Sequence, residues 1–187
     1  MMPVIRVNDA TFVDLKALSK WLETKTPTET IDALVRDKML ELGMERDQPE
    51  TGGDPLADDG DLIFEKAPGL SFTRILSASV NNSKPQKENW AGLLMKVIGV
   101  VKAKGFSGEK LVNELQVPAR ASEYTVDGYK FFPDRGISVQ GQSATDAWKE
   151  VSRLADRFRI PVEVRFQWRD NQKAQHPGKI GVIRAGA

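Results

Sequence analysis

The chain has 187 residues, of which 40% are hydrophobic and none is cysteine, so we expect a packed core and exclude disulfides and thiolate metal sites. Its formal net charge of +1 is the sum of three blocks with different charges. Residues 1–46 have seven basic and eight acidic residues, and residues 47–69 have one basic and seven acidic residues. Residues 70–187 have nineteen basic and eleven acidic residues. Such blocks indicate units with different tasks. Because there is no apolar run of about 18 residues and no basic-then-apolar leader pattern, we expect a cytoplasmic protein that does not contact a membrane.

The first 45 residues predict one short strand and two helices. In PVIRVNDATF, residues 3–8 alternate between two faces, and Asn8 or Asp9 suits the cap of the following helix. The second helix begins after TKTP, where Thr26 and Glu29 match a capping box and Pro27 suits the first helical position; Gly43 suits its end. Each helix has one apolar stripe: Phe12, Leu15, Leu18 and Leu22 in the first, and Ile31, Leu34, Val35, Met39 and Leu42 in the second.

A unit of this size cannot bury both stripes by itself, and a two-fold dimer would solve the problem. Two copies of the strand would pair antiparallel, and four helices would cover one face of the resulting ribbon. Residues 3–44, with IRVNDATFVDLKAL and TKTPTETIDALVRDKMLELG, resemble the ribbon-helix-helix family, the Arc and MetJ type of DNA-binding protein. The resemblance implies that Val4, Arg6 and Asn8 read bases in the major groove, and that Lys25, Thr26 and Thr28 hold a DNA phosphate.

Two features of this unit oppose DNA binding. Glu29 places a negative charge where the resemblance expects a phosphate, and residues 1–46 have a net charge of −1. Either Arg6 and Lys25 are concentrated at the DNA face, or the rest of the chain supplies positive charge. The alternatives are a dimerisation module that binds no DNA, an antitoxin, or a DNA-tethering accessory subunit of a plasmid or defence complex that acts through protein contacts.

The remainder predicts an acidic flexible linker over residues 46–69 and a basic α+β domain over residues 70–187. Strands are predicted in SFTRILSASV, YKFFP, GISVQGQ, PVEVRFQWRD and HPGKIGVIRA, the last two as a hairpin, and helices in ENWAGLLMKVIGVVKAKG, SGEKLVNEL and SATDAWKEVSRLADRFR. The four tryptophans, Trp21, Trp90, Trp148 and Trp168, lie on apolar stripes and are predicted to be core residues. The domain is expected to oligomerise, to add phosphate contacts, or to bind a protein partner or an effector.

A basic patch is one hypothesis for this domain. It would combine Lys149, Arg153 and Arg157, spaced along one side of a helix, with Arg165 and Arg169 on the wet face of the next strand. The acidic linker would then be able to fold across the patch in place of phosphate. The alternative is an ordinary solvated face with ion pairs to Glu150 and Asp156.

No motif indicates catalysis, a cofactor or a metal site. The only histidine, His176, lies in the turn-like AQHPGK, and a zinc site needs more ligands than one histidine. Asp134, Glu163 and Arg165 match only loosely the acidic-acidic-basic set of metal-dependent nucleases. The sequence therefore predicts a protein that is not an enzyme: a homodimeric, sequence-specific double-stranded DNA-binding protein, most simply a transcriptional repressor or other regulator.

Overall fold

The computed structural model describes residues 5–44 and 60–186, which form a mixed α+β structure with five helices and two sheets. The chain divides into two compact units, Met1–Met39 and Leu40–Ala187. The mixed α+β class is thus confirmed, whereas the dimeric ribbon stays a prediction. Within the described ranges, no helix combines the length and the apolar character needed to cross a membrane.

The first unit consists of two helices, α1 (Asp9–Trp21) and α2 (Pro27–Glu41). The last two residues of α2 already belong to the second unit. Helix α1 begins as predicted, because the Asn8 side chain accepts a hydrogen bond from the Thr11 N–H at 2.8 Å. Residues 5–8 form no strand in the single chain. The predicted strand needs a second copy to pair with, and its first residues, Pro3 and Val4, lie outside the described range.

Few side chains of the first unit are buried. Leu15 is the one fully buried hydrophobic residue among residues 5–39. In contrast, the following large apolar side chains of this range are exposed: Ile5, Val7, Phe12, Val13, Leu18, Trp21, Leu22, Leu34 and Val35. Trp21 is 87% exposed, so the prediction that it is a core residue is wrong for the single chain.

The second unit contains two sheets and three helices. The larger sheet has the order β1-β7-β6-β2, with β1 parallel to β7 and the other pairs antiparallel, and the smaller sheet has the antiparallel order β3-β5-β4. The strands are β1 (Leu62–Phe64), β2 (Thr73–Val80), β3 (Ala119–Arg120), β4 (Tyr129–Phe132), β5 (Ile137–Gln140), β6 (Val162–Trp168) and β7 (Ile180–Ala185), and the helices are α3 (Trp90–Ala103), α4 (Gly108–Glu114) and α5 (Ala144–Phe158).

Most of these elements match the sequence prediction, including the β6–β7 hairpin. Two strands were not predicted, because β1 and β3 have only three and two residues and show no alternating pattern. The linker predicted to reach residue 69 is therefore too long, since β1 already belongs to the larger sheet. Residues 45–59, which make up most of that linker, lie outside the described residues.

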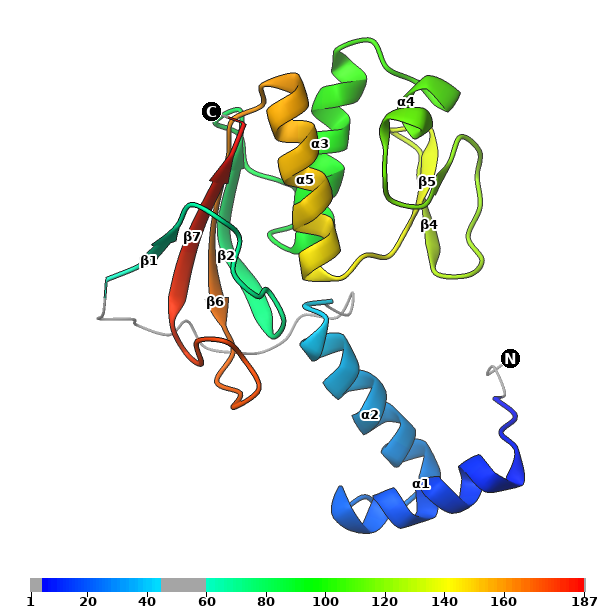
Figure 1. Cartoon of the computed structure of the whole chain (residues 1–187). Helices are drawn as coiled ribbons and strands as arrows, with labels where there is room; N and C mark the ends of the chain where they lie inside the picture. Colours follow the sequence, from blue (N-terminus) through cyan, green and yellow to red (C-terminus); the bar gives the residue numbers. More distant parts are fainter. Residues whose placement is uncertain (1–4, 45–59, 187) are drawn as a thin grey trace. The chain divides into compact units, whose positions relative to one another are not determined.

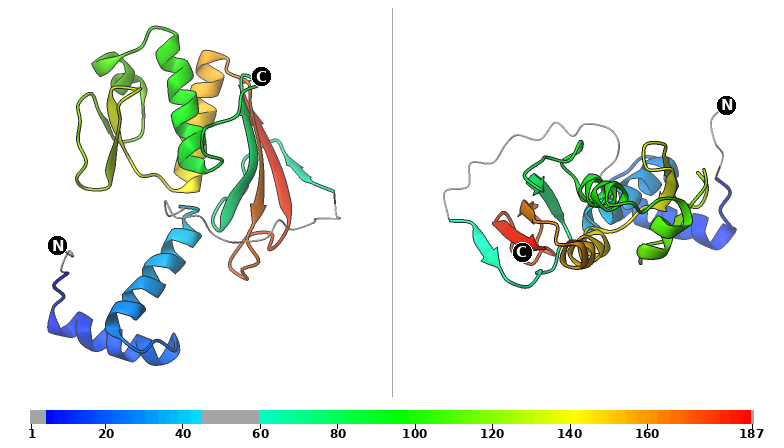
Figure 2. Two further views of the ribbon diagram at one scale, coloured as in Figure 1. Left: turned by 180° about the vertical axis from the view of Figure 1, so that it is seen from behind. Right: turned by 90° about the horizontal axis from the view of Figure 1, so that it is seen from above.

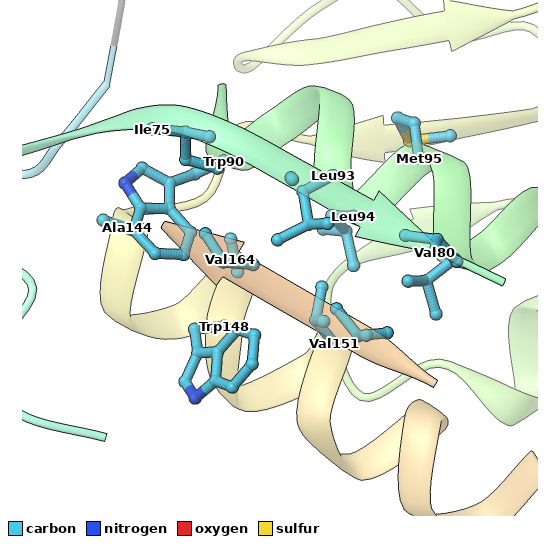
Figure 3. Close-up of a cluster of buried hydrophobic side chains, with 14 of the residues drawn as sticks. Ile75, Val80, Trp90, Leu93, Leu94, Met95, Ala144, Trp148, Val151 and Val164 are labelled. Atoms are coloured by element: carbon cyan, nitrogen blue, oxygen red, sulfur yellow. The ribbon is translucent and has the colours of Figure 1, made fainter. Parts of the chain in front are cut away.

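Helices α3 and α5 lie between the two sheets, as two opposite views show (Figures 1 and 2). Figure 3 shows side chains of α3, α5, β2 and β6 converging on one core, with Trp90, Leu93, Trp148, Val151 and Val164 among them. The predicted burial of Trp90, Trp148 and Trp168 is confirmed. Each of these strands presents one face to the helices. The opposite face of the larger sheet is mixed: Arg165 and Gln167 of β6 lie on it next to Val182 and Ile180 of β7, their cross-strand partners.

Two buried tryptophans hold the loop before β2 through their indole N–H groups. Trp168 donates to the Gly69 carbonyl at 2.8 Å, and Trp90 donates to the Thr73 hydroxyl at 3.1 Å. The Thr73 hydroxyl in turn donates to the Leu70 carbonyl at 2.6 Å. Because a buried indole N–H needs a partner, these bonds connect the core to the edge strand β2.

Gly181 in β7 lies under an aromatic ring that leaves no room for a side chain. Its cross-strand partner is the fully buried Phe166, and a Cβ atom at position 181 would be 2.6 Å from the tip of that ring. We predict that Gly181→Ala lowers the free energy of unfolding by about 1–3 kcal/mol through overpacking. Chemical denaturation measures this change. Gly60→Ala, where a Cβ meets nothing within 4 Å, is the matched control, and equal stability of the two variants would contradict the prediction.

Candidate nucleic-acid interface

The three residues predicted to read bases differ in their surroundings and in their hydrogen bonds. Val4 lies outside the described residues, and Arg6 is exposed in a segment without regular secondary structure before α1. Asn8 is also exposed, but its side-chain oxygen accepts the hydrogen bond that caps α1. Because this oxygen already has a partner, Asn8 offers a base or a phosphate only its amide NH₂ group.

The predicted phosphate site at the start of α2 is occupied by the protein's own carboxylate. Glu29 accepts a hydrogen bond from the Lys25 backbone N–H at 2.8 Å, and the Thr26 hydroxyl accepts one from the Glu29 N–H at 3.2 Å. The predicted capping pattern is therefore present, with the Glu29 carboxylate on the N–H of Lys25. A phosphate at Lys25, Thr26 and Thr28 would have to share this helix end with a negative charge.

One contact at this turn was missed from the sequence. Thr30 is fully buried, and its hydroxyl lies 2.6 Å from the hydroxyl of Thr24 and 3.1 Å from the Thr26 carbonyl, to which it donates. The turn between α1 and α2 is thus held by polar bonds. The periodicity of apolar residues carries no signal for such a contact.

Two of the three cations in the helical part of the predicted basic patch, Arg153 and Arg157, form ion pairs. Arg153 donates from Nε and Nη2 to the two carboxylate oxygens of Glu150, both at 2.8 Å, and Glu150 is 3% exposed. This carboxylate, through its hydrogen bonds and its charge, raises the pKa of Arg153. Arg157 lies 2.9 Å from the Glu114 carboxylate of α4. The predicted alternative was an exposed face with ion pairs to Glu150 and Asp156. The pair with Glu150 is present at Arg153, but Asp156 accepts a hydrogen bond from the Gly186 N–H.

The five residues of the patch do not lie on one surface. Lys149, Arg153 and Arg157 belong to α5, which covers the helix side of the larger sheet, while Arg165 points to the opposite side because β6 buries Val164 and Phe166 against the helices. Arg169 follows the end of β6, and its backbone N–H donates to the Phe72 carbonyl at 2.7 Å. The idea of a single patch is therefore wrong, because an alternating strand separates Arg165 from the helix that precedes it.

The face of the larger sheet that the helices leave open carries paired arginines. Arg74 donates from Nε and Nη2 to the Gln167 side-chain oxygen at 3.2 and 3.1 Å, and Arg184 lies 2.6 Å from the Glu163 carboxylate. Both pairs join residues that face each other across neighbouring strands. Glu163 therefore compensates the charge of Arg184 within the sheet, whereas the partner of Arg74 is a neutral amide.

Asp61, one of the acids in the predicted linker over residues 46–69, binds Arg165 on the same face. Its carboxylate oxygens lie 2.6 and 3.1 Å from Nε and Nη2 of the guanidinium. The hydrogen bond from Arg165 lowers the pKa of Asp61 below its ordinary value of 3.8. An acid of this segment thus contacts one of the arginines assigned to the patch, as the linker hypothesis expects for the segment as a whole.

The residues of the weak nuclease pattern are far from forming a metal site. Asp134 lies between β4 and β5 of the smaller sheet and pairs with its neighbour Arg135 at 2.6 Å, whereas Glu163 is in β6 of the larger sheet. In the part of the chain that the structure describes, no three His, Cys, Asp or Glu side chains gather to hold a metal ion. His176 packs in a loop against Phe64 and Trp168.

No protein-family model, curated protein or solved structure matches the chain.

The Asp61–Arg165 pair predicts a small acid-dependent contribution to stability. Because the folded pKa of Asp61 lies below 3.8, the contribution is complete above pH of about 4 and is lost as the pH falls through the folded pKa. We expect Asp61→Asn to lower the free energy of unfolding by less than about 1 kcal/mol at neutral pH, since both side chains are partly exposed.

The measurement is urea denaturation at neutral pH and near pH 3, with Glu65→Gln as a control that removes the same charge. The difference between Asp61→Asn and the unmodified chain should shrink at the lower pH. A difference that is constant with pH would show that the ion pair is not its cause.

Proposed function

We propose that the chain is a homodimeric, sequence-specific double-stranded DNA-binding protein that regulates transcription, and that its first unit forms the dimer. The observation that carries the proposal is the exposure of the apolar stripes of α1 and α2, with Leu15 as the one fully buried hydrophobic residue of residues 5–39. An exposed apolar surface of this extent is typical of an interaction site.

A second copy of the chain is the occupant that fits this surface best. The order of an N-terminal segment, a 13-residue helix and a 15-residue helix is the order expected for a ribbon-helix-helix subunit. In a two-fold dimer, Ile5 and Val7 would turn towards the helices, and Leu18 and Leu34 would meet the corresponding side chains of the other copy. Two chains would then bury the stripes that one chain leaves in water.

DNA is the partner that the outward residues favour. Arg6 is exposed in the segment that would form the ribbon, and its guanidinium presents five donors that suit a guanine edge or phosphates. Residues 70–187 carry eight more basic than acidic side chains. The second unit would therefore supply long-range attraction to DNA, which the first unit with its net charge of −1 lacks.

The dimer can be tested by placing a charge in the exposed stripe. We predict that Leu18→Glu converts the dimer into a monomer, because the substitution would bury a carboxylate in the interface. Sedimentation equilibrium of the full chain measures the mass. Ala33→Glu adds the same charge to α2 on the helix face of Glu29 and Asp37, away from the stripes, and should leave the dimer intact. A monomeric unmodified chain, or a dimeric Leu18→Glu variant, would refute this arrangement.

DNA reading can be tested at Arg6. We expect Arg6→Ala to weaken specific binding by about 1–3 kcal/mol and to relax the base preference at one position of each half-site. Selection from a randomised duplex library, followed by titration of the selected DNA at several salt concentrations, measures both effects. Arg36→Ala removes an equal charge from a pair with Asp32 on α2 and should change affinity little. Equal losses in the two variants would contradict base reading by Arg6.

A second candidate function is an antitoxin or accessory subunit that acts mainly through protein contacts. It is favoured by the occupied capping sites at Asn8 and Glu29, which reduce the groups free to hold DNA, and by the acidic balance of residues 1–46. In that case the selection from the duplex library would yield no preferred sequence, while the Leu18→Glu variant would still lose its association with a protein.

A further inference from the structure

A pocket of about 420 Å³ opens between the first turns of α3 and the smaller sheet. Both of its sides belong to the second unit, and Figure 1 shows α3 facing strands β4 and β5. A pocket of this volume is within the range of small-molecule sites. Its polar and charged lining residues are Gln86, Lys87, Asn89, Lys96, Lys130, Asp134, Arg135, Gln140 and Gln142.

The floor of the pocket is apolar and rigidly placed. Leu94 and Met95 of α3 and Val139 of β5 line it, and each is less than 10% exposed because it also belongs to the main core. Phe132 of β4 adds an aromatic ring that is partly buried. A flat apolar group would therefore find a preformed surface here, made from side chains that the fold already holds in place.

Cations from separate segments line the rim of the pocket. Lys96 on α3 and Arg135 after β4 lie there with the carboxylate of Asp134, and Lys87 before α3 and Lys130 on β4, which have interaction partners of their own, complete the set. Lys130 faces Val139 across the β4–β5 ladder, so its side chain leaves the same side of the sheet as the apolar floor. Cations that converge from separate segments on one concave site favour an anionic ligand.

Arg135 is the cation that the fold positions most firmly. Its guanidinium lies against α3 at Gly99, where a Cβ atom would be 2.7 Å from it. Nη1 lies 2.6 Å from the Asp134 carboxylate, and the Lys102 ammonium donates to the Asp134 carbonyl at 2.7 Å, which fixes the turn. The side chain is 23% exposed, and none of the described residues accepts a hydrogen bond from its Nη2 group. These donors remain for a ligand.

We propose that this pocket binds a nucleoside phosphate, with the phosphate on Arg135 and Lys96 and the base on the apolar floor of Met95 and Phe132. The cations pair with the negative charge of a phosphate, and the aromatic ring and the thioether pack against the flat face of a base. Glutamine side chains at the rim, such as Gln86, offer both donors and acceptors to a base edge. The inference uses only the second unit, so it stands independently of DNA binding by the first.

Isothermal titration of the full chain with the four nucleoside 5′-monophosphates tests the pocket, and each nucleoside and inorganic phosphate are titrated alongside. We expect saturable binding of at least one nucleotide with a Kd below about 1 mM, and at least tenfold weaker binding of its nucleoside and of inorganic phosphate, because each fills only part of the site. Absence of saturable binding by all four nucleotides would overturn the proposal. Equal affinity for inorganic phosphate would overturn the assignment of the nucleoside part.

Two variants separate the pocket from the general basic charge of the domain. Arg135→Gln should weaken nucleotide binding about tenfold or more through loss of a charged hydrogen bond. Ala91→Trp, at an exposed position that lines the pocket, should block the base without altering any charge. Lys110→Gln on α4 removes an exposed charge elsewhere and should bind normally. If circular dichroism shows Arg135→Gln to be unfolded, Ala91→Trp decides alone; unchanged binding in the folded variants would overturn the proposal.

Discussion

The second unit depends on the burial of helix α3 from two sides. One side carries Trp90, Leu93 and Val97 into the core shared with α5 and the larger sheet, and the other side faces the smaller sheet through Met95 and Gly99. A helix that is apolar almost all round requires such double cover. Helix α3, together with α5, therefore lies between the two sheets, and the Trp90 indole N–H at the start of α3 finds its partner in the Thr73 hydroxyl.

The contrast between the units shows what the apolar pattern can and cannot predict. Alternation in β6 and helical spacing in α5 located both elements, because their apolar faces are buried within the same chain. The equally regular stripes of α1 and α2 located the helices but not their partner, since Leu18 and Leu34 remain exposed. Strands as short as β1 and β3 were missed because their formation depends on neighbours distant in sequence.

Charge was harder to interpret from the sequence than hydrophobicity. Spacing along a helix correctly placed Lys149, Arg153 and Arg157 on α5, but it carried no information on Glu114, which pairs with Arg157 across a separation of more than forty residues. The acids that compensate Arg165 and Arg184 also come from other strands or from the segment before β1. The basic groups of the pocket escaped notice for the same reason: Lys96 and Arg135 meet only because two distant segments pack together.

The smaller sheet occupies the stretch of chain between α4 and α5, so the core helices and the larger sheet are built from residues on either side of it. Two of the pocket's cations, Lys130 and Arg135, lie within this stretch, while α3 contributes Leu94 and Met95 to the apolar floor. Substitutions of exposed residues within residues 120–136 would thus alter the rim of the proposed nucleotide site while leaving the central packing untouched. An arrangement of this kind lets evolution alter specificity without a loss of foldability.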